Sequence, residues 1–103
     1  MKSKTARQLG LDLQGMPGQH NALTDVPGLM VGYTTLIAGD GPLIPGDGPV
    51  RTGVTAILPR GRDPVPQPVW AGTHSFNGNG EMTGTHWIQD GGYLLGPIMI
   101  TNT

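Results

Sequence analysis

The sequence predicts a small α+β domain with more strand than helix. Short runs rich in β-branched and aliphatic residues recur along the chain, and turns rich in glycine and proline separate them. One later segment carries a carboxylate suited to a helix start and a pair of glycines suited to a helix end. The 103 residues suffice for one domain, but 18 glycines and 10 prolines leave limited material for a core.

Charge and cysteine content exclude several classes of function. Six lysines and arginines stand against seven aspartates and glutamates, without the basic stripe that drives nucleic-acid binding. The absence of cysteine excludes disulfides, thiolate catalysis and cysteine-bound zinc. Residues 11–15 do not continue the basic start into a secretory signal, and no later run is long enough to span a membrane. We therefore expect a soluble, cytoplasmic protein with no nucleic-acid or membrane partner.

The chain divides into a polar N-terminal arm, residues 1–20, and a domain that begins at residue 21. The arm is rich in polar residues with glycine and proline in its second half, so we expect no site there. Residues 22–37 predict a strand, a turn at Pro27-Gly28 and a second strand.

Two Gly-Asp-Gly-Pro segments, residues 39–42 and 46–49, predict turns rather than a calcium loop. Aspartates in a glycine-rich loop suit calcium, but the alternating acidic ligands and the closing glutamate of an EF-hand loop are missing. The next run, residues 50–58, places Val, Thr, Val, Ala and Leu alternately on one face and stops at Pro59. This alternation is the clearest strand signal in the chain.

The remaining elements are an extended connection, a short strand, a helix and a last strand. Prolines punctuate the connection, and the short strand covers residues 69–73. Glu81 would lie in the first turn of a helix over Glu81–Asp90, which Gly91-Gly92 would end. Gly84 inside this helix indicates close packing against a neighbour. Residues 96–103 form an apolar, strand-like run.

Reactive side chains gather between His74 and Trp87 without completing a catalytic pattern. Ser75 follows a histidine but lacks the Gly-x-Ser-x-Gly elbow of a nucleophile. His74 and His86 do not have the spacing of a compact zinc motif. Threonine and histidine side chains that satisfy backbone groups around glycine turns explain the repeated Gly-Thr-His equally well. We predict no catalytic residue, no metal site and no cofactor in this chain.

Five ordered blocks carry a resemblance to a known family: residues 21–28, 31–35, 48–59, 77–84 and 96–103. Together they resemble the amino-terminal part of the DmpA/BapA-type β-peptidyl aminopeptidases, the L-aminopeptidase D-esterase/amidase family. This resemblance implies an αββα sandwich like that of the N-terminal-nucleophile hydrolases, with different strand connectivity. It also implies a precursor that cuts itself into an α and a β chain, with the nucleophilic serine at the start of the β chain. The 103 residues would then be the first, incomplete part of the α chain.

The resemblance further implies a reaction and a set of partners. The serine would attack a short peptide, amide or ester, and water would release the acyl-enzyme, freeing an N-terminal L-, D- or β-amino acid. Partners would be the remainder of the α chain, the β chain and further copies of the αβ unit. Glu81, the only glutamate, is the candidate for binding the substrate amine, and Trp87 is the second candidate substrate-binding residue. The alternative is a non-catalytic assembly module that docks a partner through the Trp87 region.

Overall fold

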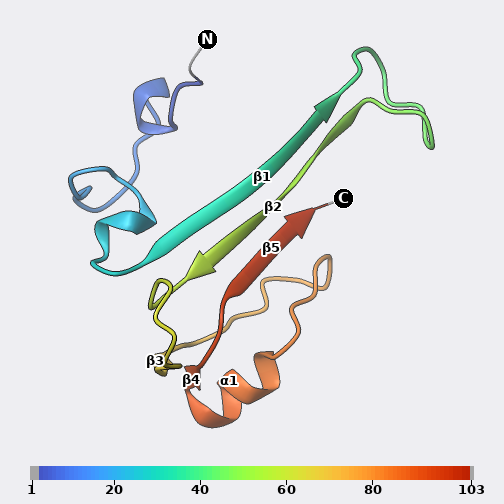
Figure 1. Cartoon of the computed structure of the whole chain (residues 1–103). Coiled ribbons are helices and arrows are strands. Elements are labelled where there is room, and N and C mark those ends of the chain that lie inside the picture. The colour runs from blue at the N-terminus through green and yellow to red at the C-terminus, as the bar shows by residue number, and fades with distance from the viewer. Residues whose placement is uncertain (1–2, 103) are drawn as a thin grey trace.

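A computed structural model describes residues 3–102 as two antiparallel sheets with one short helix (Figure 1). The larger sheet has the order β1-β2-β5, and the smaller sheet pairs β3 with β4. The strands are β1 (Met30–Ala38), β2 (Val50–Leu58), β3 (Val69–Trp70), β4 (Tyr93–Leu94) and β5 (Ile98–Asn102). The helical segments are α1 (Thr85–Gly91) and two 3-10 turns, η1 (Arg7–Leu9) and η2 (Leu23–Asp25). The predicted α+β class is confirmed, while Met1, Lys2 and Thr103 lie outside the described residues.

β1 and β2 form one long hairpin. Their register runs from Met30 opposite Leu58 to Ala38 opposite Val50, so the strand predicted for residues 50–58 is confirmed. Arg51 stabilises the loop end of the hairpin, because its guanidinium donates to the carbonyl oxygens of Ala38 at 3.1 Å and Gly39 at 2.8 Å. The same guanidinium lies 3.3 Å from the Asp40 carboxylate. The first Gly-Asp-Gly-Pro segment is thus a bend held by an arginine, whereas the second overlaps a turn at residues 45–47 that the Ile44–Gly48 bridge closes.

β5 completes the larger sheet by pairing antiparallel with β2. The paired residues run from Gly53 opposite Asn102 to Ile57 opposite Ile98. Two threonine hydroxyls add side-chain bonds, because Thr101 Oγ1 donates to the Gly53 carbonyl at 2.7 Å and Thr52 Oγ1 donates to the Asn102 carbonyl. The last predicted strand is therefore confirmed for the part that the structure describes.

The strand predicted before Pro27-Gly28 is wrong, because η2 occupies that segment. The Asp25 carboxylate accepts the backbone N–H of His20 at 2.9 Å and that of Ala22 at 3.2 Å. Such local side-chain bonds offer the backbone an alternative to a ladder. They also hold the pKa of Asp25 below its ordinary value, with the bond from His20 contributing most.

The predicted helix begins four residues late. Gly84 is its N-cap at φ 89°, a left-handed conformation that favours glycine, so Glu81 lies outside α1. The expected close packing at Gly84 is also wrong, because a Cβ there would meet no atom within 4 Å. The end is as predicted, since Gly92 caps α1 and its N–H donates to the Ile88 carbonyl at 2.8 Å. Of the strand predicted for residues 69–73, only Val69–Trp70 forms.

Neither face of the larger sheet is covered by another layer within residues 3–102. α1 packs only against β4 among the named elements, and Figure 1 shows it beyond one end of the sheet. The accessible surface is 9233 Å², whereas a folded monomer of 10.8 kDa exposes roughly 5,500 Å². The radius of gyration is 17.1 Å, against about 13 Å for a compact domain of this length. None of the described residues is buried, and none of their helices is long and apolar enough to cross a bilayer.

Both faces of the sheet nevertheless carry apolar side chains. Residues opposite each other in an antiparallel pair share a face. One face presents Met30, Leu36, Val54, Leu58 and Met99, and the other presents Val31, Tyr33, Ile37, Ile57 and Ile100. A sheet with two apolar faces has the pattern of a layer inside a sandwich.

Gly53 tests the spacing between β1 and β2. A Cβ at this position would lie 2.5 Å from the Thr34 carbonyl oxygen, a backbone atom that moves only if the strands separate. We expect Gly53→Ala to destabilise the sheet by about 1–3 kcal/mol, as overpacking does. Gly32→Ala is the matched control, because a Cβ there meets nothing within 4 Å and alanine favours a strand by about 0.5–1 kcal/mol. The free energies of unfolding of both variants are measured by urea unfolding. Equal unfolding midpoints for the two variants would contradict the predicted loss of stability in Gly53→Ala.

Asp25 makes the segment before β1 sensitive to acid. Its folded pKa is lowered by backbone hydrogen bonds, so their stabilisation is present above the unfolded pKa of about 3.9 and is lost as the pH falls through the folded value. We expect the His20 and Ala22 amide protons to lose protection, measured against their intrinsic exchange rates at the same pH, in acid and in Asp25→Ala. Asp12→Ala is the control, because Asp12 makes no side-chain hydrogen bond among the described residues. Exchange rates that do not change in Asp25→Ala would count against this role.

Candidate functional site

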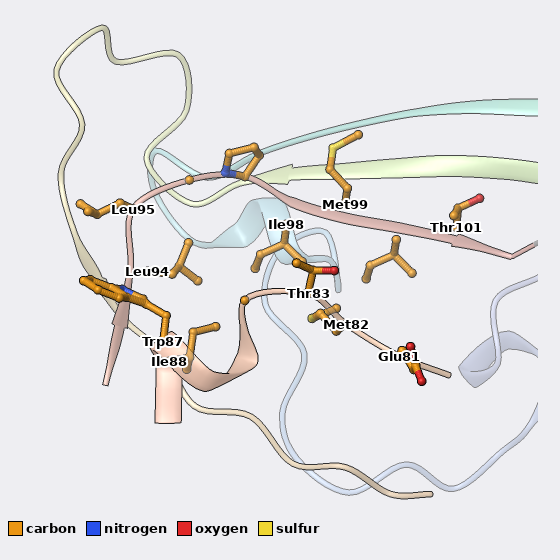
Figure 2. Close-up of a pocket in the computed structure, with 14 residues that line it drawn as sticks. Glu81, Met82, Thr83, Trp87, Ile88, Leu94, Leu95, Ile98, Met99 and Thr101 are labelled. Atoms are coloured by element: carbon orange, nitrogen blue, oxygen red, sulfur yellow. The ribbon is translucent and has the colours of Figure 1, made fainter. Parts of the chain in front are cut away.

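An apolar groove of about 650 Å³ lies between residues 81–84, α1 and β5 (Figure 2). Among residues 3–102, Glu81 is the only charged residue that lines it. Most of the wall is apolar: Met82, Trp87, Ile88, Leu94, Leu95, Ile98, Met99 and Ile100. A groove with one carboxylate and an apolar wall suits a ligand that carries a cationic group and an apolar group.

Local backbone geometry fixes Trp87 at this groove. Gly84 turns the chain from the loop into α1 through its left-handed conformation, which places Trp87 in the first turn of the helix. The indole packs edge-on against Tyr93 of β4, with ring centroids 5.5 Å apart and planes at 81°. Gly91 leaves room for this pair, because a Cβ there would lie 3.1 Å from the Tyr93 ring. Trp87 remains 55% exposed, so part of its surface is free to line the groove.

Both predicted site residues line this one groove, at its opposite ends. Figure 2 shows the Glu81 carboxylate at the far end of the 81–84 segment from Trp87. Between them, Ile98 lies on the side of β5 that faces Met82 and Thr83. Alternate residues of a strand point to opposite faces, so the Met99 side chain points away from Met82 and Thr83, although Met99 borders the groove. The groove therefore offers an elongated site with a carboxylate at one end and an aromatic ring at the other.

The remaining reactive side chains are not brought together. Ser75 Oγ donates to the Asn77 carbonyl at 3.1 Å rather than to a histidine. Within residues 3–102 no three histidine, aspartate or glutamate side chains form a group that would hold a metal ion. His74 and His86 do not line the groove. The described geometry thus supplies walls for a site and no nucleophile with its base.

Sequence reasoning missed the contribution of Leu94, Leu95 and Ile98 to the groove. β4 contains only two residues, Tyr93 and Leu94, and pairs with an equally short β3. Two residues are too few to show the alternating pattern that predicts a strand. The available signal is the apolar pair Leu94-Leu95 between a helix-ending glycine pair and Gly96-Pro97. That signal places apolar residues after the helix but does not show which segment they face.

Comparison with solved structures defines the class of protein. One similar solved structure is the L-aminopeptidase D-Ala-esterase/amidase from Ochrobactrum anthropi, described as a prototype for the serine aminopeptidases and a new variant of the Ntn hydrolase fold. It is 58% identical with a TM-score of 0.76, over 95% of this chain and 27% of that one. The PH0078 protein from Pyrococcus horikoshii OT3 is 44% identical with a TM-score of 0.78, over 97% and 29%. The chain has the fold of the matching part of this Ntn hydrolase variant.

The family follows from the sequence. Residues 21–103 match Peptidase family S58, and the chain belongs to this family. Over 98 residues it is 57% identical to the β-peptidyl aminopeptidase BapA of Sphingosinicella microcystinivorans and 50% identical to that of Sphingosinicella xenopeptidilytica. Each match covers 95% of this chain and 24% of the relative, so the chain spans about a quarter of their length. The resemblance seen in the five sequence blocks is confirmed.

Proposed function

We propose that this chain is the first part of the α chain of a self-processing serine aminopeptidase or amidase. The protein releases N-terminal L-, D- or β-amino acids from short peptides, amides or esters through an acyl-enzyme. The observation that carries the proposal is the family match over residues 21–103 together with 57% identity to a β-peptidyl aminopeptidase. Because the chain spans 24% of that relative, the nucleophilic serine is proposed to lie outside these 103 residues.

The contacts of Ser75 support this placement of the nucleophile. The chain holds two serines, and Ser3 lies in the N-terminal arm. Ser75 donates its hydroxyl proton to a backbone carbonyl, and within residues 3–102 no side-chain base accepts the proton that an attacking hydroxyl must lose. The contribution of this chain is therefore a scaffold and one wall of the substrate pocket, while the catalytic serine and its oxyanion-binding groups come from elsewhere.

In this proposal the groove receives part of the substrate. The Glu81 carboxylate binds the free amine of the substrate, and the apolar wall that ends at Trp87 accommodates a side chain. The support is chemical, because Glu81 is the only charged residue among the described residues of the lining, and a carboxylate bonds an ammonium group more strongly than a neutral acceptor does. Assembly into αβ units and a cytoplasmic location stay predictions from the sequence.

The alternative, a binding module that docks a partner through the Trp87 region, rests on the 55% exposure of that indole. It makes a different prediction. A module of this kind would be complete without a second chain, and Trp87→Ala would release its partner without changing any hydrolysis.

The proposed function can be tested by asking whether the natural protein consists of two chains. We expect the natural protein that contains this sequence to hydrolyse β-alanyl or D-alanyl amides and to contain a second chain that begins with serine. Intact mass and N-terminal sequencing measure the processing, and substitution of that serine by alanine should abolish it. The 103-residue chain alone should show no activity. Hydrolysis by the chain alone would place the nucleophile inside it and refute the proposal.

Substitution of Glu81 tests the amine site separately. We expect Glu81→Gln in the whole enzyme to raise KM about tenfold or more with little change in kcat, because a charge-assisted hydrogen bond contributes about 1.5–3 kcal/mol. Asp90→Asn is the matched control, since Asp90 is an exposed carboxylate of α1 outside the groove. An unchanged KM in Glu81→Gln would refute the amine-binding role of Glu81. It would not bear on the result of the processing experiment.

A further inference from the structure

The exposed loop before Glu81 contains two Asn-Gly pairs that the proposed function does not use. They are Asn77-Gly78 and Asn79-Gly80, and all four residues are exposed. Glycine lacks a Cβ, so its backbone nitrogen approaches the side-chain carbonyl carbon of the preceding asparagine with little obstruction. We propose that Asn79 is a site of spontaneous deamidation, and that in the folded protein it reacts faster than Asn77.

The reaction needs only water. The backbone nitrogen of Gly80, after losing its proton to solvent, attacks the Cγ carbon of Asn79. A bond forms between these atoms, the bond from Cγ to Nδ2 breaks, and ammonia leaves with the proton that it gains. The resulting cyclic imide then adds water at one of its two carbonyls and opens to aspartate or isoaspartate at position 79.

The hydrogen bonds of the loop distinguish the two asparagines. Oδ1 of Asn77 accepts the backbone N–H of Asn79 at 2.9 Å, and the Asn77 carbonyl accepts the Ser75 hydroxyl at 3.1 Å. Rotation of the Asn77 carboxamide toward Gly78 must break the first of these bonds, which slows ring closure several-fold. The Asn79 carboxamide has no such bond within the part of the chain that the structure describes, so it rotates toward Gly80 without that cost.

The two glycines do not differ in the same way. An added Cβ would meet no atom within 4 Å at Gly78 or at Gly80, and neither glycine has a left-handed φ. The difference between the sites is therefore located in the asparagine side chains. Conversion at position 79 would place a new negative charge two residues from Glu81, at one end of the groove.

Peptide mapping of the whole protein tests the proposal. The protein is incubated in mildly alkaline buffer, digested at intervals and analysed by mass spectrometry with fragmentation that separates aspartate from isoaspartate. We expect several-fold faster conversion at position 79 than at position 77 in the folded protein, and a smaller difference in denaturant. Equal or faster conversion at position 77, or no conversion at position 79 in the folded protein, would overturn the proposal.

Two alanine variants provide matched controls. Gly80→Ala should slow the reaction at Asn79 several-fold and leave Asn77 unchanged, because the new Cβ obstructs only the Gly80 nitrogen. Gly78→Ala should slow the reaction at Asn77 and leave Asn79 the faster site. Both changes fit the loop, since each position has open space for a Cβ. A rate at Asn79 that does not respond to Gly80→Ala would show that the proposed ring closure is not the route.

Discussion

The pairing of β2 with both of its neighbours is the interaction on which the rest of the structure depends. β2 carries the whole register of β1 on one edge and that of β5 on the other, and threonine hydroxyls reinforce the second pairing. β5 in turn forms one wall of the groove opposite residues 81–84. A shift of one residue between β2 and β5 would exchange the two faces of β5 and turn Ile98 away from Met82. The shape of the candidate site thus follows from a ladder that lies mostly outside it.

The same sheet shows why this chain needs covering layers. A backbone hydrogen bond contributes about 0.5–1.5 kcal/mol net, whereas ordering each residue costs about 1–2 kcal/mol, so burial must supply the difference. Within residues 3–102 no side chain is buried, although both faces of the larger sheet present apolar residues. Relatives about four times as long as this chain have additional residues from which such layers can be built. The exposed faces therefore support the proposal that the sheet is one layer of a larger sandwich.

Elements whose hydrophobic pattern and end signals lie within their own residues could be predicted from the sequence. Elements that depend on a side-chain hydrogen bond, on one backbone angle or on a distant strand could not. Residues 50–58 alternate and stop at a proline, so their strand was predictable with its bounds. The segment before Pro27-Gly28 has apolar residues typical of a strand, but the Asp25 carboxylate draws its backbone into a turn. The helix start depended on the left-handed conformation of Gly84. Glu81 and Trp87 were predictable as candidates, but their common groove required the position of β5.

The glycines of residues 77–84 differ in whether their backbone conformation requires glycine. Gly84 is explained by its backbone, because φ is 89° and an L-residue there would be strained. Gly78 and Gly80 have no such explanation within the described residues, since their φ angles are not left-handed and a Cβ would fit. The same loop ends at Glu81, so its two Asn-Gly pairs lie beside the only carboxylate among the described residues that line the groove.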